Sequence, residues 1–223
     1  MFEKIKTVNL FNTEKTIAVN IFENTNYPWE VLEKIGDFII NLGKTLTSDK
    51  FDCPKENVWI AKSCKIYSNT YINGPCIIDE ESELRPGAFI RGNVIVGKKC
   101  VVGNSTELKN CILFDSVQVP HFNYVGDSVL GYKSHIGAGG ITSNVKSDKT
   151  KVVLHLDNAD IETGMKKFGA MIGDFVEVGC NSVLNPGTII GRNSNIYPLS
   201  SVRGYVPENS IFKGVRGTFE KTI

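Results

Sequence analysis

The chain has 223 residues, a length that can bury a substantial core as one domain or as one domain with an appendage. Its 25 Lys and Arg nearly balance its 24 Asp and Glu, whereas a protein that coats nucleic acid carries a clear basic excess. The first residues lack the uninterrupted apolar core of a signal peptide, and no apolar run is long enough to cross a bilayer. We therefore expect a soluble cytoplasmic protein with neither a nucleic-acid nor a membrane partner.

Residues 1–55 are predicted to form an N-terminal extension. Residues 16–22 are mostly apolar and predict a short strand or extended segment. From residue 28 to about residue 46, apolar side chains recur at intervals of three and four, which predicts one amphipathic helix with Pro28 in its first turn. Because the following residues predict a solenoid with open ends, we interpret this extension as a helical cap.

An aliphatic residue then returns at every sixth position. The first series is Ile60, Ile66, Ile72, Ile78, Leu84, Ile90, Val96, Val102 and Leu108. A period of six matches neither an α-helix nor a simple alternating strand, so it indicates a repeat architecture. The series resumes from Ile172 to Val202, and it persists with slips in between. We predict an all-β fold, a parallel β-helix over residues 56–215 with three hexads in each coil.

Glycine directly follows many of these aliphatic anchors, among them Gly97, Gly103 and Gly179. We expect it there because a tight corner needs positive φ. The period is interrupted by a polar insertion at about residues 144–170, which is either a functional loop or a solvated one. Residues 216–223 are predicted to be a C-terminal tail.

Six cysteines invite a disulfide or metal interpretation, but no CxxC pair occurs. Four cysteines fall in the small inward position of the repeat: Cys64, Cys76, Cys100 and Cys111. We interpret these as buried structural thiols in a reducing compartment.

The repeat pattern resembles the hexapeptide-repeat acyltransferases, whose family fold is a left-handed parallel β-helix. The segments PHFNYVGD (residues 120–127), HIGAG (135–139) and ITSN (141–144) resemble the acetyltransferase domain of the bifunctional N-acetylglucosamine-1-phosphate uridyltransferase. The segments ETG (162–164) and FGA (168–170) resemble archaeal-type sugar-1-phosphate nucleotidylyltransferase proteins with such a domain. The resemblance covers about residues 82–204.

This resemblance implies transfer of an acetyl group from acetyl-CoA, the co-substrate, to the amine of a phosphorylated or nucleotide-linked amino sugar. It also implies a homotrimer and no metal. Residues 1–55 are too short for the uridyltransferase half and contain no glycine-rich nucleotide loop, so we expect no nucleotidyltransferase activity.

The resemblance places the general base at His121. An amino sugar's nitrogen is mostly ammonium at neutral pH, and only the free amine can attack a thioester. Histidine, with an unperturbed pKa of about 6.5, is suited to take that proton. Arg85 and Lys109 match the family's phosphate-binding cations, and two cations that converge on a dianion form a clamp.

The resemblance also implies sugar contacts from Tyr124 and Asn144, with a further lysine at either Lys149 or Lys151. Gly137, Ala138 and Gly139 either approach the pantetheine and the thioester carbonyl or simply form a tight corner. The chain departs from the family pattern at His135, where the family has asparagine. That change touches the acceptor pocket, so the sugar could differ.

Two alternatives differ in class. His121, His135 and His155 are the only histidines, and some hexapeptide-repeat proteins are carbonic anhydrases that bind zinc through three histidines. The other alternative is a non-catalytic protein that binds a sugar nucleotide or a protein partner.

Overall fold

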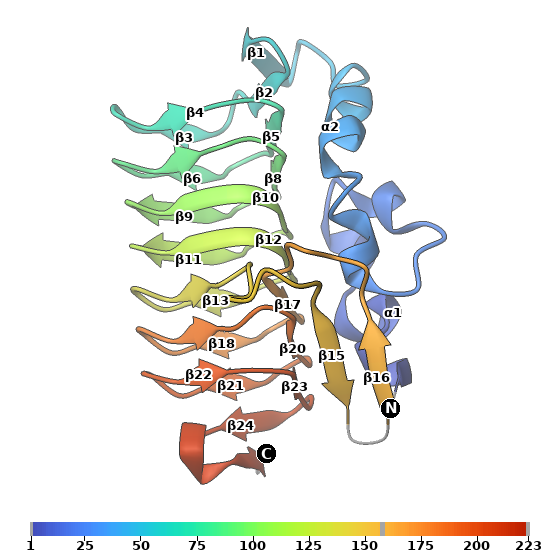
Figure 1. Ribbon diagram of the computed structural model, residues 1–223. Coiled ribbons are helices and arrows are strands. Elements are labelled where there is room, and N and C mark those ends of the chain that lie inside the picture. The colour runs from blue at the N-terminus through green and yellow to red at the C-terminus, as the bar shows by residue number, and fades with distance from the viewer. Residues whose placement is uncertain (1, 157–158, 222–223) are drawn as a thin grey trace.

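The computed structural model describes residues 2–156 and 159–221. Short parallel strands stack into a three-sided prism, and a helical N-terminal segment lies along one side of it (Figure 1). The predicted all-β fold, a left-handed parallel β-helix, is confirmed. Among the described helices, none has the length and apolar character needed to cross a membrane.

Each coil contributes a strand to each of three faces. The first face contains β2 (Val58–Ala61), β5 (Cys76–Ile78), β8 (Val94–Val96), β17 (Ala170–Ile172), β20 (Thr188–Ile190) and β23 (Tyr205–Val206). The second contains β3 (Lys65–Ile66), β6 (Glu83–Leu84), β9 (Val101–Asn104), β11 (Gln118–His121), β13 (His135–Ile136), β18 (Glu177–Val178), β21 (Asn195–Ile196) and β24 (Ser210–Phe212). The third contains β4 (Tyr71–Ile72), β7 (Phe89–Ile90), β14 (Ile141–Thr142), β19 (Val183–Leu184) and β22 (Ser201–Val202).

Two long strands, β10 (Glu107–Leu113) and β12 (Tyr124–Leu130), run from the third face onto the first without a break. The first half of β10 pairs with β7, and its second half pairs with β8. These two strands therefore join the first and third faces into one continuous sheet. The corner that they cross is the one that carries the polar site described below.

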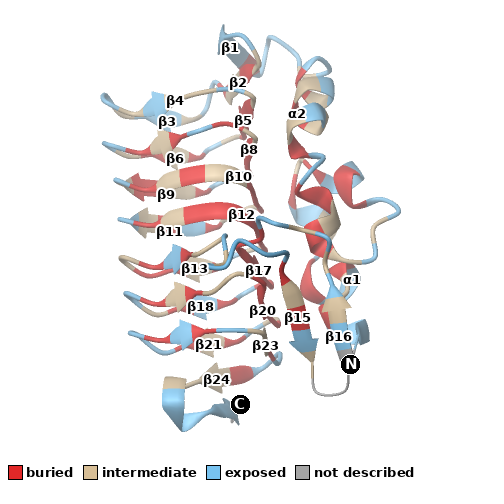
Figure 2. Cartoon of the chain, viewed as in Figure 1, coloured by how far each residue is buried: buried red, intermediate tan, exposed pale blue. Residues whose placement is uncertain are grey.

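The six-residue period places its anchors inside the prism. Leu84, Ile90 and Val102 are fully buried, as are most of the anchors in the later coils (Figure 2). In the first coil the anchors are less covered, since Ile60 and Ile72 are partly buried and Ile66 is exposed. The small inward positions hold residues such as Ser82, whose hydroxyl donates to the Gly97 carbonyl at 2.6 Å and so satisfies a buried polar group.

The cysteine prediction is confirmed by the burial of Cys76, Cys100 and Cys111, whereas Cys64 is partly buried. Burial raises the pKa of the Cys64 thiol to about 11 and that of Cys76 to about 12. These thiols are therefore protonated and unreactive while the chain is folded.

The expectation for the glycines after the anchors was wrong. Gly97, Gly103 and Gly179 do not have positive φ, which occurs two residues later at such positions as Lys99, Ser105 and Asn181. Close packing between coils explains the glycines instead. A Cβ at Gly103 would lie 1.5 Å from the Pro120 carbonyl oxygen of the next coil, and one at Gly179 would lie 2.4 Å from the Pro198 nitrogen.

The N-terminal segment consists of η1 (Phe2–Ile5), α1 (Thr7–Leu10), η2 (Thr13–Lys15), η3 (Val19–Phe22), η4 (Pro28–Val31), α2 (Ile35–Gly43) and β1 (Phe51–Lys55). Residues 16–22 end in a 3-10 helix rather than a strand, and the single predicted helix is divided into η4 and α2. Helix α2 contacts β5, β8 and β10 along the first face (Figure 1). The segment therefore covers a side of the prism, while β1 pairs antiparallel with β2 at the first coil.

Aromatic packing holds this segment against the prism. The ring of Phe114, which is fully buried, lies 5.3 Å from that of Phe11 and 5.5 Å from that of Phe22. Trp29 lies 5.5 Å from Phe168. Two polar links add to this: the Asn12 N–H donates to Asp174 Oδ2 at 2.7 Å, and the Asp174 N–H donates to the Leu10 carbonyl at 3.1 Å.

The insertion forms the antiparallel hairpin of β15 (Val153–Leu156) and β16 (Ala159–Glu162). The two ends of the insertion lie next to each other, because the Phe168 N–H donates to the Asn144 carbonyl at 2.9 Å. At the C-terminal end, η5 (Gly214–Arg216) leads into β25 (Thr218–Glu220), which pairs antiparallel with β24. The boundaries proposed at residues 55 and 215 stay predictions.

Candidate active site

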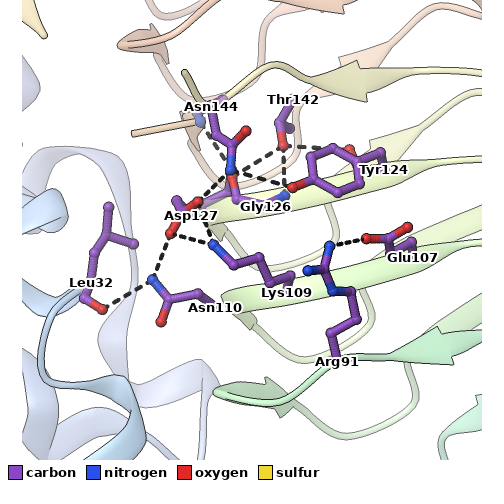
Figure 3. Close-up of polar contacts among 12 residues, drawn as sticks. Leu32, Arg91, Glu107, Lys109, Asn110, Tyr124, Gly126, Asp127, Thr142 and Asn144 are labelled. Atoms are coloured by element: carbon purple, nitrogen blue, oxygen red, sulfur yellow. Dashed lines mark hydrogen bonds and ion pairs between the residues drawn. The ribbon is translucent and has the colours of Figure 1, made fainter. Parts of the chain in front are cut away.

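Asp127 is the hub of a polar network at the corner where the third face meets the first (Figure 3). Its side chain is almost fully buried and accepts hydrogen bonds from three neighbours. Lys109 Nζ lies 3.2 Å from Oδ2, Asn110 Nδ2 donates to Oδ1 at 2.9 Å, and Asn144 Nδ2 donates to Oδ2. We call this edge of the prism, with the stacked positions 109, 126, 143, 185 and 203, the hub corner.

Strand register explains why these residues meet. Lys109 is the register partner of Gly126, so its side chain lies beside Asp127 on the adjacent coil. The Asn110 amide also donates to the Leu32 carbonyl at 3.1 Å. The hub therefore ties two coils, the start of the insertion and the N-terminal segment together.

Three of the residues chosen from the sequence, Lys109, Tyr124 and Asn144, lie together at this corner. Asn144 Nδ2 donates to the Tyr124 hydroxyl at 3.3 Å. Gly126 leaves room for that phenol, since a Cβ there would lie 2.5 Å from its oxygen. Burial, followed by the charge of Asp127, raises the pKa of Tyr124 above its ordinary value. The phenol is therefore a neutral donor near pH 7.

Lys109 is less available to a phosphate than the sequence suggested. Its charge is already matched by a carboxylate that is buried, and a phosphate dianion beside Lys109 would be repelled by Asp127. Sequence reasoning missed both Asp127 and Asn110. Asp127 ends the same motif that contains His121, and an acidic residue between aliphatic anchors was the available signal.

His121 lies at a different edge, the corner where the second face meets the third. We call this edge, with Arg85, His121 and residues 137–139, the histidine corner. The His121 side chain is exposed at the end of β11. Its backbone N–H donates to Asn123 Oδ1 at 3.1 Å, and Asn123 Nδ2 donates to the Gly137 carbonyl at 2.8 Å. The buried Asn123 side chain, also missed from the sequence, therefore fixes His121 against the glycine loop.

The glycine loop is tightly packed. The Gly139 N–H donates to the His121 carbonyl at 3.0 Å, and the Gly137 N–H donates to Val178 at 2.7 Å. A Cβ at Gly139, whose φ is +71°, would lie 2.2 Å from Asn181 Oδ1. Packing alone thus accounts for both glycines. The Ala138 N–H, in contrast, makes no hydrogen bond to the described residues.

Arg85 occupies the histidine corner two coils before His121. Leu84 pairs with Val102, which in turn pairs with Val119. Arg85 Nε lies 3.4 Å from Glu83 Oε1. Arg85 and Lys109 therefore lie at different corners and do not converge within one chain. Lys149 and Lys151 are both exposed in the insertion, which leaves the choice between them open.

The three histidines lie on separate elements. His135 Nδ1 lies 2.7 Å from Glu177 Oε2 on the second face, and His155 Nδ1 lies 2.9 Å from Asp160 Oδ1 in the hairpin. Within residues 2–156 and 159–221, no group of three His, Cys, Asp or Glu side chains is arranged to hold a metal ion. The zinc alternative gains no support from this arrangement, and the absence of a metal stays a prediction.

The fold and the repeat make this chain a hexapeptide-repeat β-helix protein. The family model "GMPPB C-terminal domain" matches residues 72–156. A bifunctional sugar-1-phosphate nucleotidylyltransferase/acetyltransferase from Sulfurisphaera tokodaii is 30% identical over 221 residues, covering 95% of this chain and 54% of that protein. The bifunctional protein GlmU of Methanococcus maripaludis is 35% identical over 194 residues, covering 78% and 43%.

The chain resembles the bifunctional nucleotidylyltransferase/acetyltransferase proteins in sequence, and it spans about half the length of the curated relatives it matches. Among solved structures, AntD, an N-acyltransferase from Bacillus cereus in complex with dTDP-4-amino-4,6-dideoxyglucose and Coenzyme A, has a TM-score of 0.39 at 15% identity. That alignment covers 78% of this chain and 91% of AntD.

Proposed function

We propose that this chain is an acyltransferase that moves an acetyl group from acetyl-CoA to the amine of a phosphorylated or nucleotide-linked amino sugar, with His121 as general base. The observation that carries the proposal is that the Asn123 side chain hydrogen-bonds both the His121 backbone and the glycine loop. An exposed imidazole and the unused Ala138 N–H lie on one corner and are held together by Asn123. The names of the related proteins support the same chemistry.

The residues divide the reaction between them. His121 takes a proton from the attacking amine as the new N–C bond forms at the thioester carbonyl. The Ala138 N–H is the donor available to the oxygen that becomes negative in the tetrahedral intermediate. When the C–S bond breaks, protonated His121 returns its proton to the departing thiolate, which leaves as the free CoA thiol. Tyr124 and Asn144 hold sugar hydroxyls at the far side of the third face.

Release of the free CoA thiol tests this proposal, with glucosamine 1-phosphate, galactosamine 1-phosphate and UDP-linked amino sugars as acceptors. We expect turnover with one acceptor and a loss of about 10²- to 10⁴-fold in kcat for His121→Ala. Acetyl-CoA should still bind this variant in calorimetry. Gln118→Ala, at the exposed opposite end of β11, is the matched control and should keep full turnover.

If the wild type releases no CoA thiol with any of these acceptors, or if His121→Ala keeps full activity, the proposal is contradicted. A sugar nucleotide that binds without turnover would favour the non-catalytic alternative. The homotrimer and the lack of nucleotidyl transfer also stay predictions. Sedimentation equilibrium tests the trimer, and pyrophosphate release from UTP with a sugar 1-phosphate tests nucleotidyl transfer.

A further inference from the structure

A groove of about 570 Å³ lies between the insertion and the C-terminal coils of the prism. The insertion contributes one wall, including Lys146 and His155. The prism contributes the other wall through Asn185, Pro186 and Arg203. Figure 1 shows the β15–β16 hairpin beside these lower coils.

The hairpin wall is built into the fold. Val152 and Leu154 are buried, and they approach the prism so closely that a Cβ at Gly187 would lie 2.7 Å from Val152 Cγ1 and 3.0 Å from Leu154 Cδ2. The Thr163 hydroxyl donates to the Val152 carbonyl at 2.6 Å. The groove is therefore preformed, as is usual for small-molecule sites.

The charged side chains of the groove favour an anion. Arg203 is exposed and makes no ion pair within the described part of the chain. Asp148 also lines the groove, and its Oδ2 lies 3.3 Å from Nζ of the partly buried Lys146. Because Asp148 is exposed, water and salt weaken this pair. Among the described residues Arg203 also has no hydrogen-bond partner, and the planar guanidinium of an arginine is suited to hold two phosphate oxygens at once.

The position of the groove identifies the side of the reaction that it serves. Ser143 and Asn185 belong to the stacked positions of the hub corner. The Ser143 N–H donates to the Leu184 carbonyl, and the Asn185 N–H donates to the Val202 carbonyl. Arg203 follows Val202 at the same edge. Asn144, which bonds Tyr124 and Asp127, directly follows Ser143. The groove thus continues the acceptor side, away from the histidine corner and its glycine loop.

We propose that this groove binds the nucleoside diphosphate portion of the acceptor, so that the substrate is a nucleotide-linked amino sugar rather than a sugar 1-phosphate. This inference rests on the proposed function and narrows its substrate class. The volume supports it, because pockets of about 300 to 1,000 Å³ enclose a whole small molecule and a single phosphate would leave most of this one empty. Arg203 would hold the diphosphate, while Pro186 and Val145 offer apolar surface to the nucleoside.

Binding of free nucleotide tests the groove without any acetyl transfer. We expect UDP or ADP to raise the thermal midpoint of the full chain and to bind in calorimetry, with an affinity at least tenfold weaker for Arg203→Gln. Arg216→Gln makes the same change of charge at an exposed position outside the groove and should bind as the wild type does. Equal affinity in the two variants, or no binding of either nucleotide, overturns the inference.

Two further measurements separate the remaining interpretations. If saturating CoA displaces the nucleotide, the groove belongs to the acyl donor and the inference is wrong. In turnover, Arg203→Gln should raise KM for the nucleotide-linked acceptor with little change in kcat. Turnover with a sugar 1-phosphate alone would keep the proposed function and reject this inference, whereas a chain that binds UDP but transfers no acetyl group would retain the groove and reject the enzyme.

Discussion

Replacing Asp127 with asparagine is the sharpest test of the hub. The Asp127 side chain is 4% exposed and faces the Lys109 ammonium at 3.2 Å, while the Lys109 side chain is 23% exposed. Removing one member of a fully buried ion pair costs about 3–5 kcal/mol. Because Lys109 can turn partly to water, we expect about 2–3 kcal/mol for Asp127→Asn. The new Nδ2 group would also face other donors, which prevents the amide from replacing the carboxylate.

The assay is urea unfolding together with calorimetry. A loss of about 2–3 kcal/mol in a chain of this size corresponds to a fall of roughly 4–12 °C in Tm. Glu107→Gln is the matched control, since Glu107 lies 2.7 Å from Arg91 but both side chains are about a third or more exposed, and it should cost less than about 1 kcal/mol. Lys109→Met should recover part of the loss in the Asp127→Asn background. The reasoning fails if Asp127→Asn costs no more than Glu107→Gln.

Two further predictions concern buried acids and thiols. Burial raises the pKa of Asp79, whose Oδ2 has no hydrogen-bond partner among the described residues. At pH values between the unfolded pKa of about 3.9 and the higher folded pKa, Asp79 is protonated in the folded state and ionised in the unfolded chain. Its stabilising effect is therefore fully present at low pH and declines as pH rises through the folded pKa. Asp79→Asn should therefore raise the free energy of unfolding in urea by about 1 kcal/mol at pH 7 and by less at pH 4. An equal gain at both pH values would contradict this. For the thiols, Ellman's reagent should modify Cys53 and Cys180 rapidly in the native chain and Cys76, Cys100 and Cys111 only after unfolding, and rapid modification of all six cysteines would contradict the packed interior.

The chemistry proposed for the chain depends on a residue that the sequence identified, His121, and on neighbours whose role only their positions in space reveal. His121 was found through a resemblance and stands on an exposed strand end, where only its neighbours give it a role. Asn123 and Ala138 are such neighbours: Asn123 was missed from the sequence, and Ala138 was selected only as part of the glycine loop. Asp127 was visible in the motif, but its importance follows from the three donors that meet it in space.

The sequence by itself determined the prism, because a buried position that returns every sixth residue can be satisfied only by a coil with short sides and regular corners. It also indicated which cysteines point into the prism, since they share that period: Cys76, Cys100 and Cys111 are buried as predicted, whereas Cys64, in the first coil, is only partly buried. It did not determine why glycine follows the anchors, because the contact with the next coil is made across about eighteen residues of chain.

Only the tertiary structure decided where the N-terminal segment lies and which candidate residues meet. The pattern of residues 28–46 indicates that the helix has an apolar side but not what packs against it. In the structure the helix packs against the first face of the prism rather than against its end. Likewise Lys109 and Arg85 have the same place after an anchor in sequence, yet they project from different corners because the coil turns between them. Spacing along the chain specifies the repeat, whereas contacts between coils specify the site.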